Sequence, residues 1–436
     1  MQPLSPLDGR YAQKVDALRP FFTEDALIQA RILVELKYLI ALGEEKGVPE
    51  LKTFTQKEDQ AMSKLYLGFN ASEADKVREI EKTTNHDVKA VEYYLQKELP
   101  KILGKNFKTE FIHFALTSED TNNLAYGTLI NDAIQDVLLP ELEGLVKSLE
   151  VLAAEHAKTS MLSLTHGQSA TPTTLGKELL VFVDRLDRQA EQLFGFSMQG
   201  KFGGAVGNYM AHRSAYPKID WQRFGVDFIE SLGLEPLDHT TQINPHDDLA
   251  ELSHLFVRIN TILLGLSRDL WMYISRGVFV QSVVKGEVGS STMPHKVNPI
   301  DFENAEGNLG LSSALFTHFA EKLPISRLQR DLSDSTVQRN IGVAFGYHVL
   351  ALASLKKGLS KLSVDRSRLQ RELADHPEVF TEAIQTVMRK NGITDAYEQM
   401  KSLSRGKKIT SNDLRAFTEK LKIPKEDKKR LLELLA

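Results

Sequence analysis

The chain has 436 residues, enough for two to four domains at roughly 100–200 residues per domain. Its hydrophobic content of 42%, charged content of 26% and net charge of −4 are typical of a globular protein with no general attraction to nucleic acid or anionic membranes. It has no cysteine, which excludes disulfides, thiolate metal sites and cysteine nucleophiles. No signal-peptide core opens the chain and no apolar stretch reaches the roughly 18–20 residues of a membrane span, so a cytoplasmic protein is expected.

The spacing of apolar residues predicts helices almost throughout, and therefore an all-α fold. Shorter helices joined by loops are expected over residues 1–110, and a longer helix over about 120–138. A further helix begins near Pro140, with apolar positions at Leu142, Leu145, Leu149 and Leu152. Another follows Thr171-Pro172, with Gln189 as the one polar position in a seam made of Leu175, Leu179, Phe182, Leu186, Leu193 and Phe196.

Residues 245–275 carry the clearest helical pattern. Their apolar spacings alternate between three and four, which is a heptad seam. The seam residues are Leu249, Leu252, Phe256, Ile259, Leu263, Leu266 and Leu270. Pro245 suits the first helical position and Asn244 the cap before it. Further apolar residues lie outside the seam, so we expect burial on several sides, as in an oligomeric bundle.

Helical patterning continues over 301–360, where Pro324 predicts a kink or a break. Beyond about 365 the composition becomes more polar and basic, with short amphipathic segments. These patterns predict three all-α regions, at 1–110, 111–364 and 365–436, the central one being a bundle of long helices. The only β element expected is a small hairpin near 202–215.

Six polar stretches interrupt the helices. They are DGRY (8–11), TTNHDVKAVEYY (83–94), ALTSEDTNN (115–123), THGQSATPT (165–173), GSSTMPHKVNP (289–299) and RDLSDSTVQRN (330–340). Most of them, taken alone, are consistent with helix caps or solvated loops. Thr117 and Asp120, for example, have the spacing of a capping box, and His86 and His166 are consistent with ordinary hydrogen-bonded loop histidines. The arginines of the last stretch suit a phosphate, because a guanidinium can bind it with two parallel hydrogen bonds.

The loop 289–299 is harder to explain as a mere connection. Gly289 permits close approach of a ligand, and the backbone N–H groups beside Ser290 and Ser291 can form an anion-holding concavity. Lys296 adds a positive charge. A serine alkoxide would be stabilised in such a setting, which makes the loop a candidate site for a base or a nucleophile.

This loop resembles the signature loop of the fumarase/aspartase superfamily of lyases, whose members eliminate fumarate or a close relative from a succinyl-type substrate. The histidine of MPHK resembles the adenylosuccinate lyase family, since fumarases and aspartases usually have glycine there and argininosuccinate lyases glutamine. TTNHDVKAVEYY, HFALTSED and SLTHGQSATPTTLGKE resemble the same family, in its longer bacterial type. The resemblance spans almost the whole chain in the expected order.

The resemblance implies a three-region lyase fold whose central long helices tetramerise into a multi-helix core, with each active site assembled from three subunits. It implies elimination of fumarate from adenylosuccinate, giving AMP, and from succinylaminoimidazole-carboxamide ribotide, in purine biosynthesis. The implied partners are small nucleotide substrates, with no nucleic acid and no membrane. No cofactor and no metal are implied.

The resemblance also implies the acid and base of this reaction. Ser290 is the implied base, and Ser291 is the neighbour to test against it. His166 is the implied general acid, and Glu303 is placed to orient it. A base must remove the Cβ proton next to a carboxylate, and an acid must protonate the leaving nitrogen.

The implied substrate ligands form three groups. Lys296 and Asn298 contact the substrate carboxylate, and Thr117, Ser118 and Gln242 contact the succinyl group. The nucleotide and phosphate ligands are Arg10, Tyr11, Arg330, Ser335 and Arg339. The pocket is completed by Asn85, His86 and Asp87, with His86 supporting the acid.

Two other functions fit part of the pattern. A carboxymuconate cycloisomerase can share the loop SSTMPHK, but its substrate has no phosphate for the arginines to bind. A non-catalytic scaffold that has kept the fold would have no need to retain Ser290, His166, Lys296 and Glu303 together. The sequence ends at KRLLELLA, where longer-type relatives usually continue with a further short helical segment, and none of the expected site residues lies in that segment.

Overall fold

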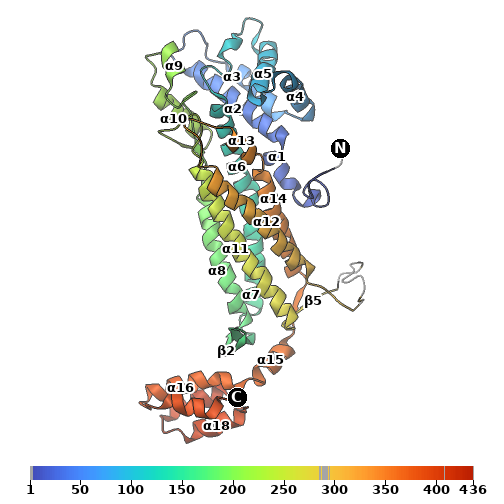
Figure 1. The fold of residues 1–436 in the computed structure, drawn as a ribbon, viewed down its shortest axis with the longest axis vertical. Helices are drawn as coiled ribbons and strands as arrows, with labels where there is room; N and C mark the ends of the chain where they lie inside the picture. Colours follow the sequence, from blue (N-terminus) through green and yellow to red (C-terminus); the bar gives the residue numbers. More distant parts are fainter. Residues whose placement is uncertain (1–2, 284–285, 287–292, 294, 407, 436) are drawn as a thin grey trace. The chain divides into compact units, whose positions relative to one another are not determined.

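The computed structural model describes residues 3–283, 286, 293, 295–406 and 408–435 (Figure 1). The chain divides into two compact units. Unit 1 comprises Met1–Leu145, Leu186–Gly265 and Asn304–Leu355; unit 2 comprises Val146–Arg185, Leu266–Glu303 and Lys356–Ala436. The division into regions 1–110, 111–364 and 365–436 stays a prediction. The expected all-α class is confirmed, because helices account for nearly all regular structure among the described residues.

The first part of unit 1 is a cluster of helices packed around α2 (Glu24–Glu44). This helix is buried on several faces and packs against α3 (Gln56–Leu67), α4 (Ala71–Thr84), α5 (Asp87–Leu103) and α6 (Ser118–Ala133). It begins at Thr23, whose hydroxyl accepts a hydrogen bond from the Ala26 N–H (3.2 Å). The remaining elements here are α1 (Arg19–Phe22) and the 3₁₀ turns Ala12–Lys14, Asp16–Leu18 and Thr109–Phe111.

The helices expected over 120–138 and from Pro140 form one continuous helical run. Between α6 and α7 (Leu139–Glu155) the chain makes a π-helical turn, Ile134–Leu138. Proline has no N–H to donate to the preceding turn, and a π turn accommodates this missing hydrogen bond without ending the helix. The sequence predicted that Pro140 starts a new helix, whereas in the structure Pro140 lies within a continuous helical run.

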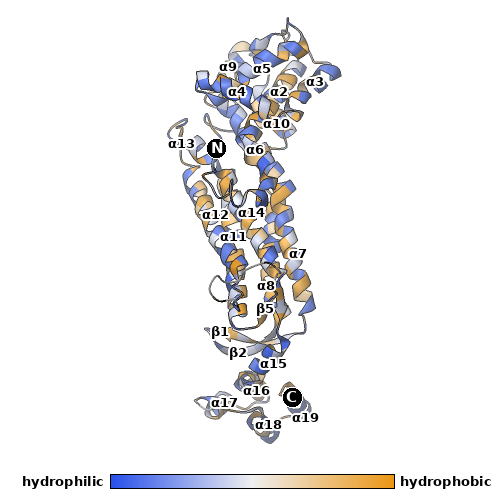
Figure 2. Cartoon of the chain, turned by 90° about the vertical axis from the view of Figure 1, so that its right-hand side faces the viewer, coloured by the Kyte–Doolittle hydropathy of each residue, from blue (hydrophilic) through white to orange (hydrophobic). Residues whose placement is uncertain are grey.

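The long helices of the prediction are α8 (Leu175–Phe194), α11 (Asp247–Ser275), α12 (Ile300–Lys322) and α14 (Ile341–Leu359). The seam of α11 is confirmed, since each of its seven residues is at most 3% exposed. Figure 2 shows apolar residues along α7 and α11. The start of α11 differs from the prediction by two residues, because His246 has a left-handed backbone (φ 62°) that cannot continue into a helical turn. Pro324 follows the end of α12, so the expected break is confirmed.

Within unit 1, buried polar pairs link three of these helices. Asn260 on α11 donates to the Ser312 hydroxyl on α12 (3.0 Å), and Ser312 donates to the Ala344 carbonyl on α14 (2.9 Å). His348 Nδ1 lies 2.7 Å from Asn260 Oδ1. These groups are fully or almost fully buried, so each bond fixes the register of one helix against another. The connecting helices of this unit are α9 (Met210–Ala215), α10 (Trp221–Ser231) and α13 (Ser333–Gln338).

The strands are few and short. β1 (Ser160–Thr165) and β2 (Gln168–Thr174) form an antiparallel hairpin, β3 (Gln199–Gly200) pairs in parallel with β4 (Glu235–Pro236), and β5 (Phe279–Gln281) pairs with β6 (Leu362–Val364). The hairpin expected near 202–215 was wrong: that segment forms tight glycine turns followed by α9.

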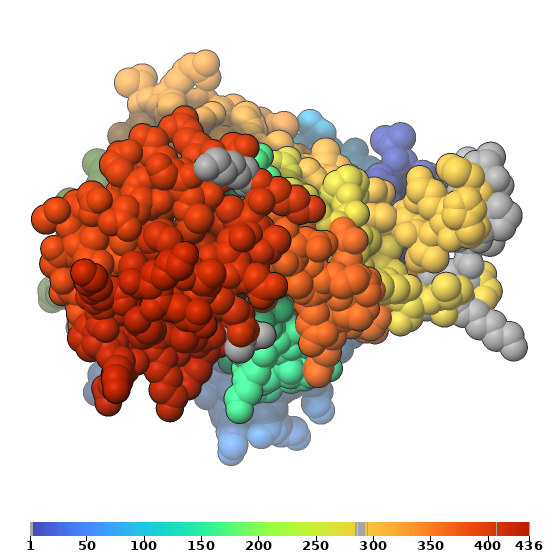
Figure 3. Space-filling view, turned by 90° about the horizontal axis from the view of Figure 1, so that it is seen from below, coloured from blue at the N-terminus to red at the C-terminus, as the bar shows by residue number. Residues whose placement is uncertain are grey.

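Unit 2 ends in a small helical cluster. Its elements are α15 (Arg366–Ala374), the 3₁₀ turn Pro377–Phe380, α16 (Thr381–Lys390), α17 (Ala396–Ser404), α18 (Ser411–Lys420) and α19 (Lys425–Leu434). Apolar residues of α16–α19 form a core of their own around Ile384, Met388 and Leu414, each fully buried. Figure 3 shows these C-terminal residues as one closely packed body.

Among the described residues, α11 alone is long and apolar enough to cross a membrane. Its most apolar window is 61% buried inside the protein, as expected for the core helix of a bundle.

Candidate active site

The expected site residues lie in both units. Those in unit 1 are Arg10, Tyr11, Asn85, His86, Asp87, Thr117, Ser118, Gln242, Arg330, Ser335 and Arg339. Those in unit 2 are His166, Lys296, Asn298 and Glu303. The expected base Ser290, with Gly289 and Ser291, lies outside the described residues.

A chain of charged hydrogen bonds connects expected residues of unit 1. Arg339 donates to Glu24 (Nη1 to Oε1, 2.8 Å) and to Asp87 (Nη2 to Oδ2, 3.2 Å). Asp87 Oδ2 also accepts from Arg31 Nη2 at 2.7 Å. Arg31, only 3% exposed, donates through Nε to Asn122 Oδ1 (2.8 Å). Burial raises the pKa of the Asp87 carboxyl, but Arg31, the Val88 N–H and Arg339 together lower it by more, so this pKa is below its ordinary value.

The same chain continues to Arg330. Asn122 Nδ2 donates to Glu119 Oε1 (2.9 Å), which also accepts from Arg330 Nη2 (3.1 Å). Arg330 Nη1 lies 3.4 Å from Gln242 Oε1, and Gln242 donates to the Ala205 carbonyl (2.9 Å). The structure thus connects Asp87, Gln242, Arg330 and Arg339 in one network, which we call the arginine–carboxylate network together with Glu24, Arg31, Glu119 and Asn122.

His86 and Ser118 meet at the edge of this network. His86 is the N-cap of α5, and its Nδ1 accepts from the Lys89 N–H (3.2 Å). In the neutral ring the proton is therefore assigned to Nε2, which lies 3.5 Å from the Ser118 hydroxyl. Asn85 precedes His86 in a left-handed conformation (φ 49°) that ends α4. The polar stretch 83–94 thus supplies two helix caps and, through His86, a contact to Ser118.

The Thr117 backbone is held by a buried ion pair that sequence reasoning missed. The Asp120 carboxylate accepts from the Thr117 N–H (2.8 Å) and from Lys201 Nζ (2.6 Å). The Gly203 and Gly204 N–H groups donate to the same carboxylate at 3.0 Å. Asp120 and Lys201 are both 0% exposed. The N-terminus of α6 is therefore fixed to the glycine turn that follows β3.

Arg10 and Tyr11 lie in the N-terminal segment of unit 1. The Arg10 guanidinium and the Lys14 ammonium lie 5.9 Å from the centre of the Tyr11 ring, and the Tyr11 hydroxyl accepts from Asn304 Nδ2 (3.4 Å). These contacts give the aromatic ring a positively charged setting.

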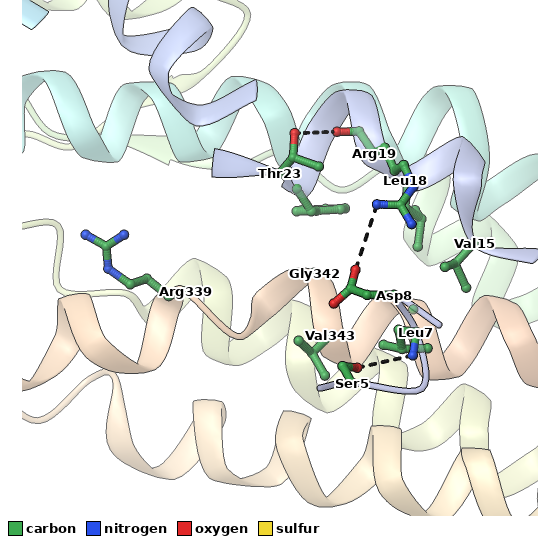
Figure 4. A pocket seen from close by; sticks show the side chains of 12 residues that line it. Ser5, Leu7, Asp8, Val15, Leu18, Arg19, Thr23, Arg339, Gly342 and Val343 are labelled. Carbon is green, nitrogen blue, oxygen red and sulfur yellow. Dashed lines mark hydrogen bonds and ion pairs between the residues drawn. The ribbon is translucent and has the colours of Figure 1, made fainter. Parts of the chain in front are cut away.

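A cavity of about 180 Å³ lies beside this segment, and Figure 4 shows its lining. Arg339 reaches it from the network, and an ion pair between Arg19 and Asp8 (3.8 Å) spans it. Arg10 and Tyr11 are not part of its lining. The lining of the cavity thus includes both the expected phosphate ligand Arg339 and residues of the N-terminal segment.

In unit 2, His166 occupies the turn of the β1–β2 hairpin. His166 and Gly167 both have positive φ (54° and 72°), as a two-residue turn of type I′ requires. The imidazole is exposed at the tip of the hairpin.

Glu303 lies in the first turn of α12, and its Oε1 accepts from the Trp271 indole N–H (3.1 Å). Among the described residues of this chain, no hydrogen bond joins Glu303 to His166. Lys296 is exposed and Asn298 is half-buried in the segment before α12. The expected orientation of His166 by Glu303 stays a prediction.

The residues that sequence reasoning missed left two kinds of signal. Glu119 and Asn122 fall inside the polar stretch 115–123, next to the residues that were named. Arg31 and Glu35 are charged residues four apart in an apolar helix, a pattern that predicts buried partners. No local pattern marks Glu24 or Lys201. In the part of the chain described here, no group of three His, Asp or Glu side chains is arranged to hold a metal.

Two family models match the chain. A lyase family matches residues 9–311, and the C-terminal region of adenylosuccinate lyases matches residues 326–436. Adenylosuccinate lyase from Legionella pneumophila (strain Philadelphia 1) is 52% identical over 434 residues, covering 100% of this chain and 95% of the relative. The enzyme of the same name from Escherichia coli K12 is 47% identical over 428 residues, covering 98% of this chain and 94% of the relative.

Two solved structures share the fold. The fumarate lyase from Mesorhizobium sp. BNC1 has a TM-score of 0.76 at 19% identity, covering 96% of this chain and 94% of that one. The 3-carboxy-cis,cis-muconate lactonizing enzyme from Pseudomonas putida has a TM-score of 0.73 at 20% identity, covering 96% and 92%. The fold alone therefore does not separate these activities, whereas the full-length sequence identity does.

Proposed function

The chain belongs to the adenylosuccinate lyase family, and on that premise we propose how its residues carry the reaction. The enzyme is a carbon–nitrogen lyase that eliminates fumarate from adenylosuccinate, giving AMP, and from succinylaminoimidazole-carboxamide ribotide, giving the carboxamide ribotide. Both are steps of purine biosynthesis. The substrate loses a proton from Cβ, the Cα–N bond breaks, and the leaving nitrogen gains a proton.

In the proposed mechanism Ser290 removes the Cβ proton and His166 protonates the leaving nitrogen. Negative charge develops on the succinyl carboxylate as the proton leaves, and Lys296 stabilises it together with the amide of Asn298. The exposed turn that holds His166 suits a group that must reach a substrate. Glu303, at the start of α12, would accept a hydrogen bond from one imidazole N–H and so fix the orientation and tautomer of the ring.

The observation that carries this proposal is the arginine–carboxylate network of unit 1. Arg330 and Arg339 lie on either side of α13 and belong to one hydrogen-bonded cluster. Arg330 Nε is buried and has no partner among the described residues. Two guanidinium groups so placed, with Ser335 between them in sequence, suit a nucleotide 5′-phosphate. A phosphate fixed there would orient the distant Cα–N bond for cleavage.

We place these sites in a homotetramer, where each is assembled from three subunits, in the cytoplasm. Exposed apolar side chains on the helices of unit 2 support an oligomer. They are Val151, Leu180, Val181, Trp271, Met272 and Ile300. A helix with large apolar residues on an exposed face is typical of a subunit interface.

The test is fumarate release followed by absorbance, with Ser290→Ala compared against Ser291→Ala. Loss of the base is expected to lower kcat by roughly 10²–10⁴-fold or more while substrate still binds. A Ser290→Ala enzyme with unchanged kcat beside an inactive Ser291→Ala enzyme would reassign the base. Mixing His166→Ala and Ser290→Ala proteins with subunit exchange should restore part of the activity, and no recovery after verified exchange would contradict shared sites.

A further inference from the structure

The short helix α13 (Ser333–Gln338) is buried through two polar side chains only. Its buried residues are Asp334 and Gln338, at 3% and 5% exposure. They are four residues apart, so they lie on one face of the helix. A helix of six residues is not stable by itself, and its place must be set by contacts with the rest of the fold. The partner of this polar face therefore decides where α13 lies.

That partner is His246, which is 4% exposed at the entry to α11. The Gln338 amide nitrogen lies 2.9 Å from His246 Nε2, and Asp334 Oδ2 lies 3.8 Å from the same nitrogen. The first distance is a hydrogen bond, whereas the second is an electrostatic contact too long to be one. Burial raises the pKa of Asp334, but His246, the Ser335 N–H and the Arg330 charge lower it by more, so this carboxyl remains ionised.

The backbone at His246 is itself fixed. Its φ of 62° is left-handed, its N–H donates to Asn244 Oδ1 (2.7 Å), and its carbonyl accepts from the Ala250 N–H (3.0 Å). The ring is therefore carried by a rigid turn and not by a flexible loop. A fixed ring is what a positioning contact requires.

A second contact joins the same turn to the start of the 330–339 segment. Gln242, four residues before His246, bonds to Arg330 (3.4 Å). The turn 242–246 thus contacts the segment before α13 through Arg330 and the helix itself through Gln338.

The expected phosphate ligands lie next to this buried face. Ser335 follows Asp334 and Arg339 follows Gln338, and each step along a helix turns the side chain by about 100°. Arg339 still has helical backbone angles, as the C-cap of α13. Ser335 is half-buried and Arg339 is exposed, so anchoring one face of α13 presents the neighbouring face to a ligand.

We infer that His246 is a positioning residue of the phosphate site: through Gln338 it holds α13 so that Arg330, Ser335 and Arg339 meet the 5′-phosphate of the substrate. This inference rests on the proposed function, which assigns the phosphate to these three residues. His246 itself does not touch the substrate in this scheme.

The test uses the full enzyme with two substrates, adenylosuccinate and the succinyl-nucleoside that lacks the phosphate. Gln338→Leu keeps the size of the side chain and removes the bond to His246. Its KM for adenylosuccinate is expected to rise on the order of tenfold, the effect of one buried hydrogen bond, with a smaller change in kcat. Its kcat/KM for the phosphate-free compound should stay within about twofold of wild type, because the loss acts through the phosphate.

His246→Asn is the second variant, because asparagine tolerates the left-handed backbone but is too short to reach Gln338. It should show the same phosphate-dependent rise in KM. His348→Gln is the matched control, since His348 is a buried histidine of unit 1 with one hydrogen bond, to Asn260, away from α13. Any loss in this control should be equal on the two substrates.

Arg339→Lys separates failure of the inference from failure of the proposed function. If Arg339→Lys loses kcat/KM equally on both compounds, the phosphate does not bind there and the proposed function is reassigned. If Arg339→Lys is selective for the phosphorylated substrate while Gln338→Leu and His246→Asn lose equally on both, or lose nothing, His246 has no positioning role and the inference is overturned.

Discussion

The buried ion pair of Lys201 and Asp120 is a stability test of the site's framework. Both side chains are 0% exposed and their charged atoms are 2.6 Å apart. Lys201 Nζ also donates to the Gly204 carbonyl (2.8 Å). The change to make is Lys201→Met, which keeps an unbranched apolar stem and removes the ammonium group. Asp120 is then left as a buried carboxylate without a counter-charge.

The expected loss of stability depends on the hydrogen bonds that Asp120 keeps in the Lys201→Met protein. Removing one partner of a buried ion pair costs about 3–5 kcal/mol, mostly because the remaining charge is uncompensated. Three backbone N–H groups, from Thr117, Gly203 and Gly204, still solvate this carboxylate. We therefore expect a loss in the lower half of that range, about 3–4 kcal/mol. Asp120→Asn should cost less stability in the Lys201→Met protein than in the wild type, which corresponds to a coupling energy of about 1–3 kcal/mol.

The two tryptophans make the assay specific to one unit. Trp221 is in unit 1 and its ring centroid lies 4.7 Å from that of His212, beside the ion pair, whereas Trp271 is in unit 2. In a Trp271→Phe background, Trp221 fluorescence reports urea unfolding of unit 1 alone. A loss under about 1 kcal/mol for Lys201→Met, or strictly additive double-mutant effects, would refute the reasoning, because neither is compatible with a desolvated, coupled pair.

Two further changes test the backbone and the titration of unit 1. Burial lowers the pKa of His113, but the charge and hydrogen bond of Glu35 (2.6 Å) raise it by more, so it lies above its ordinary value. The stability that wild type gains over His113→Gln should thus be fully present below about pH 6.5 and decline as the pH rises through the raised pKa. A difference between the two urea midpoints that does not change with pH would contradict this. Gly207→Ala should cost more than Gly233→Ala. Both have positive φ (68° and 74°), but only at Gly207 would a Cβ lie 2.3 Å from a carbonyl, that of Thr240, and equal midpoints would contradict this.

The long helices could be predicted because one periodicity decides them. In α11 the alternation of three and four places every seam residue on one side, and burial of that side follows whatever the partners are. The join between α6 and α7 could not be predicted in this way. Pro140 is equally compatible with starting a helix and with a π turn inside one, and tertiary packing decides between them.

The β1–β2 hairpin was missed although its turn carried a signal. His166-Gly167 provides the two positive φ values of a type I′ turn, and histidine is among the residues that tolerate them. The flanking stretch is rich in Thr and Ser and lacks the alternation of a half-buried strand, so the polar pattern favoured a loop. The same polar residues were interpreted as part of a functional site, and their strand conformation was not predicted.

The site itself could be predicted as a set of residues but not as a set of contacts. Four of the named residues lie in the arginine–carboxylate network, yet their direct partners include Arg31 and Glu119. Arg31 and Asn122 are 91 positions apart, and no spacing rule connects them. Contacts of this kind depend on how α2 packs against α6, which is decided by apolar burial elsewhere in the two helices.

The carboxylates paired with the two arginines imply an order in which a phosphate would displace them. Arg330 is 17% exposed and its partner Glu119 is 4% exposed, so breaking that pair leaves a buried carboxylate without its cation. Arg339 and Glu24 are 41% and 59% exposed, and Glu24 can move into water at little cost. A phosphate should therefore displace Glu24 from Arg339, and reach Arg330 through its unpaired Nε without breaking the bond to Glu119.

Glu24→Gln removes the competing charge, and we expect it to lower the KM for adenylosuccinate a few-fold at low ionic strength and to leave the KM for the phosphate-free compound unchanged. A KM that rises would show that Glu24 holds Arg339 in place and does not compete for it. A KM that falls equally for both compounds would show that Glu24 does not compete with the phosphate.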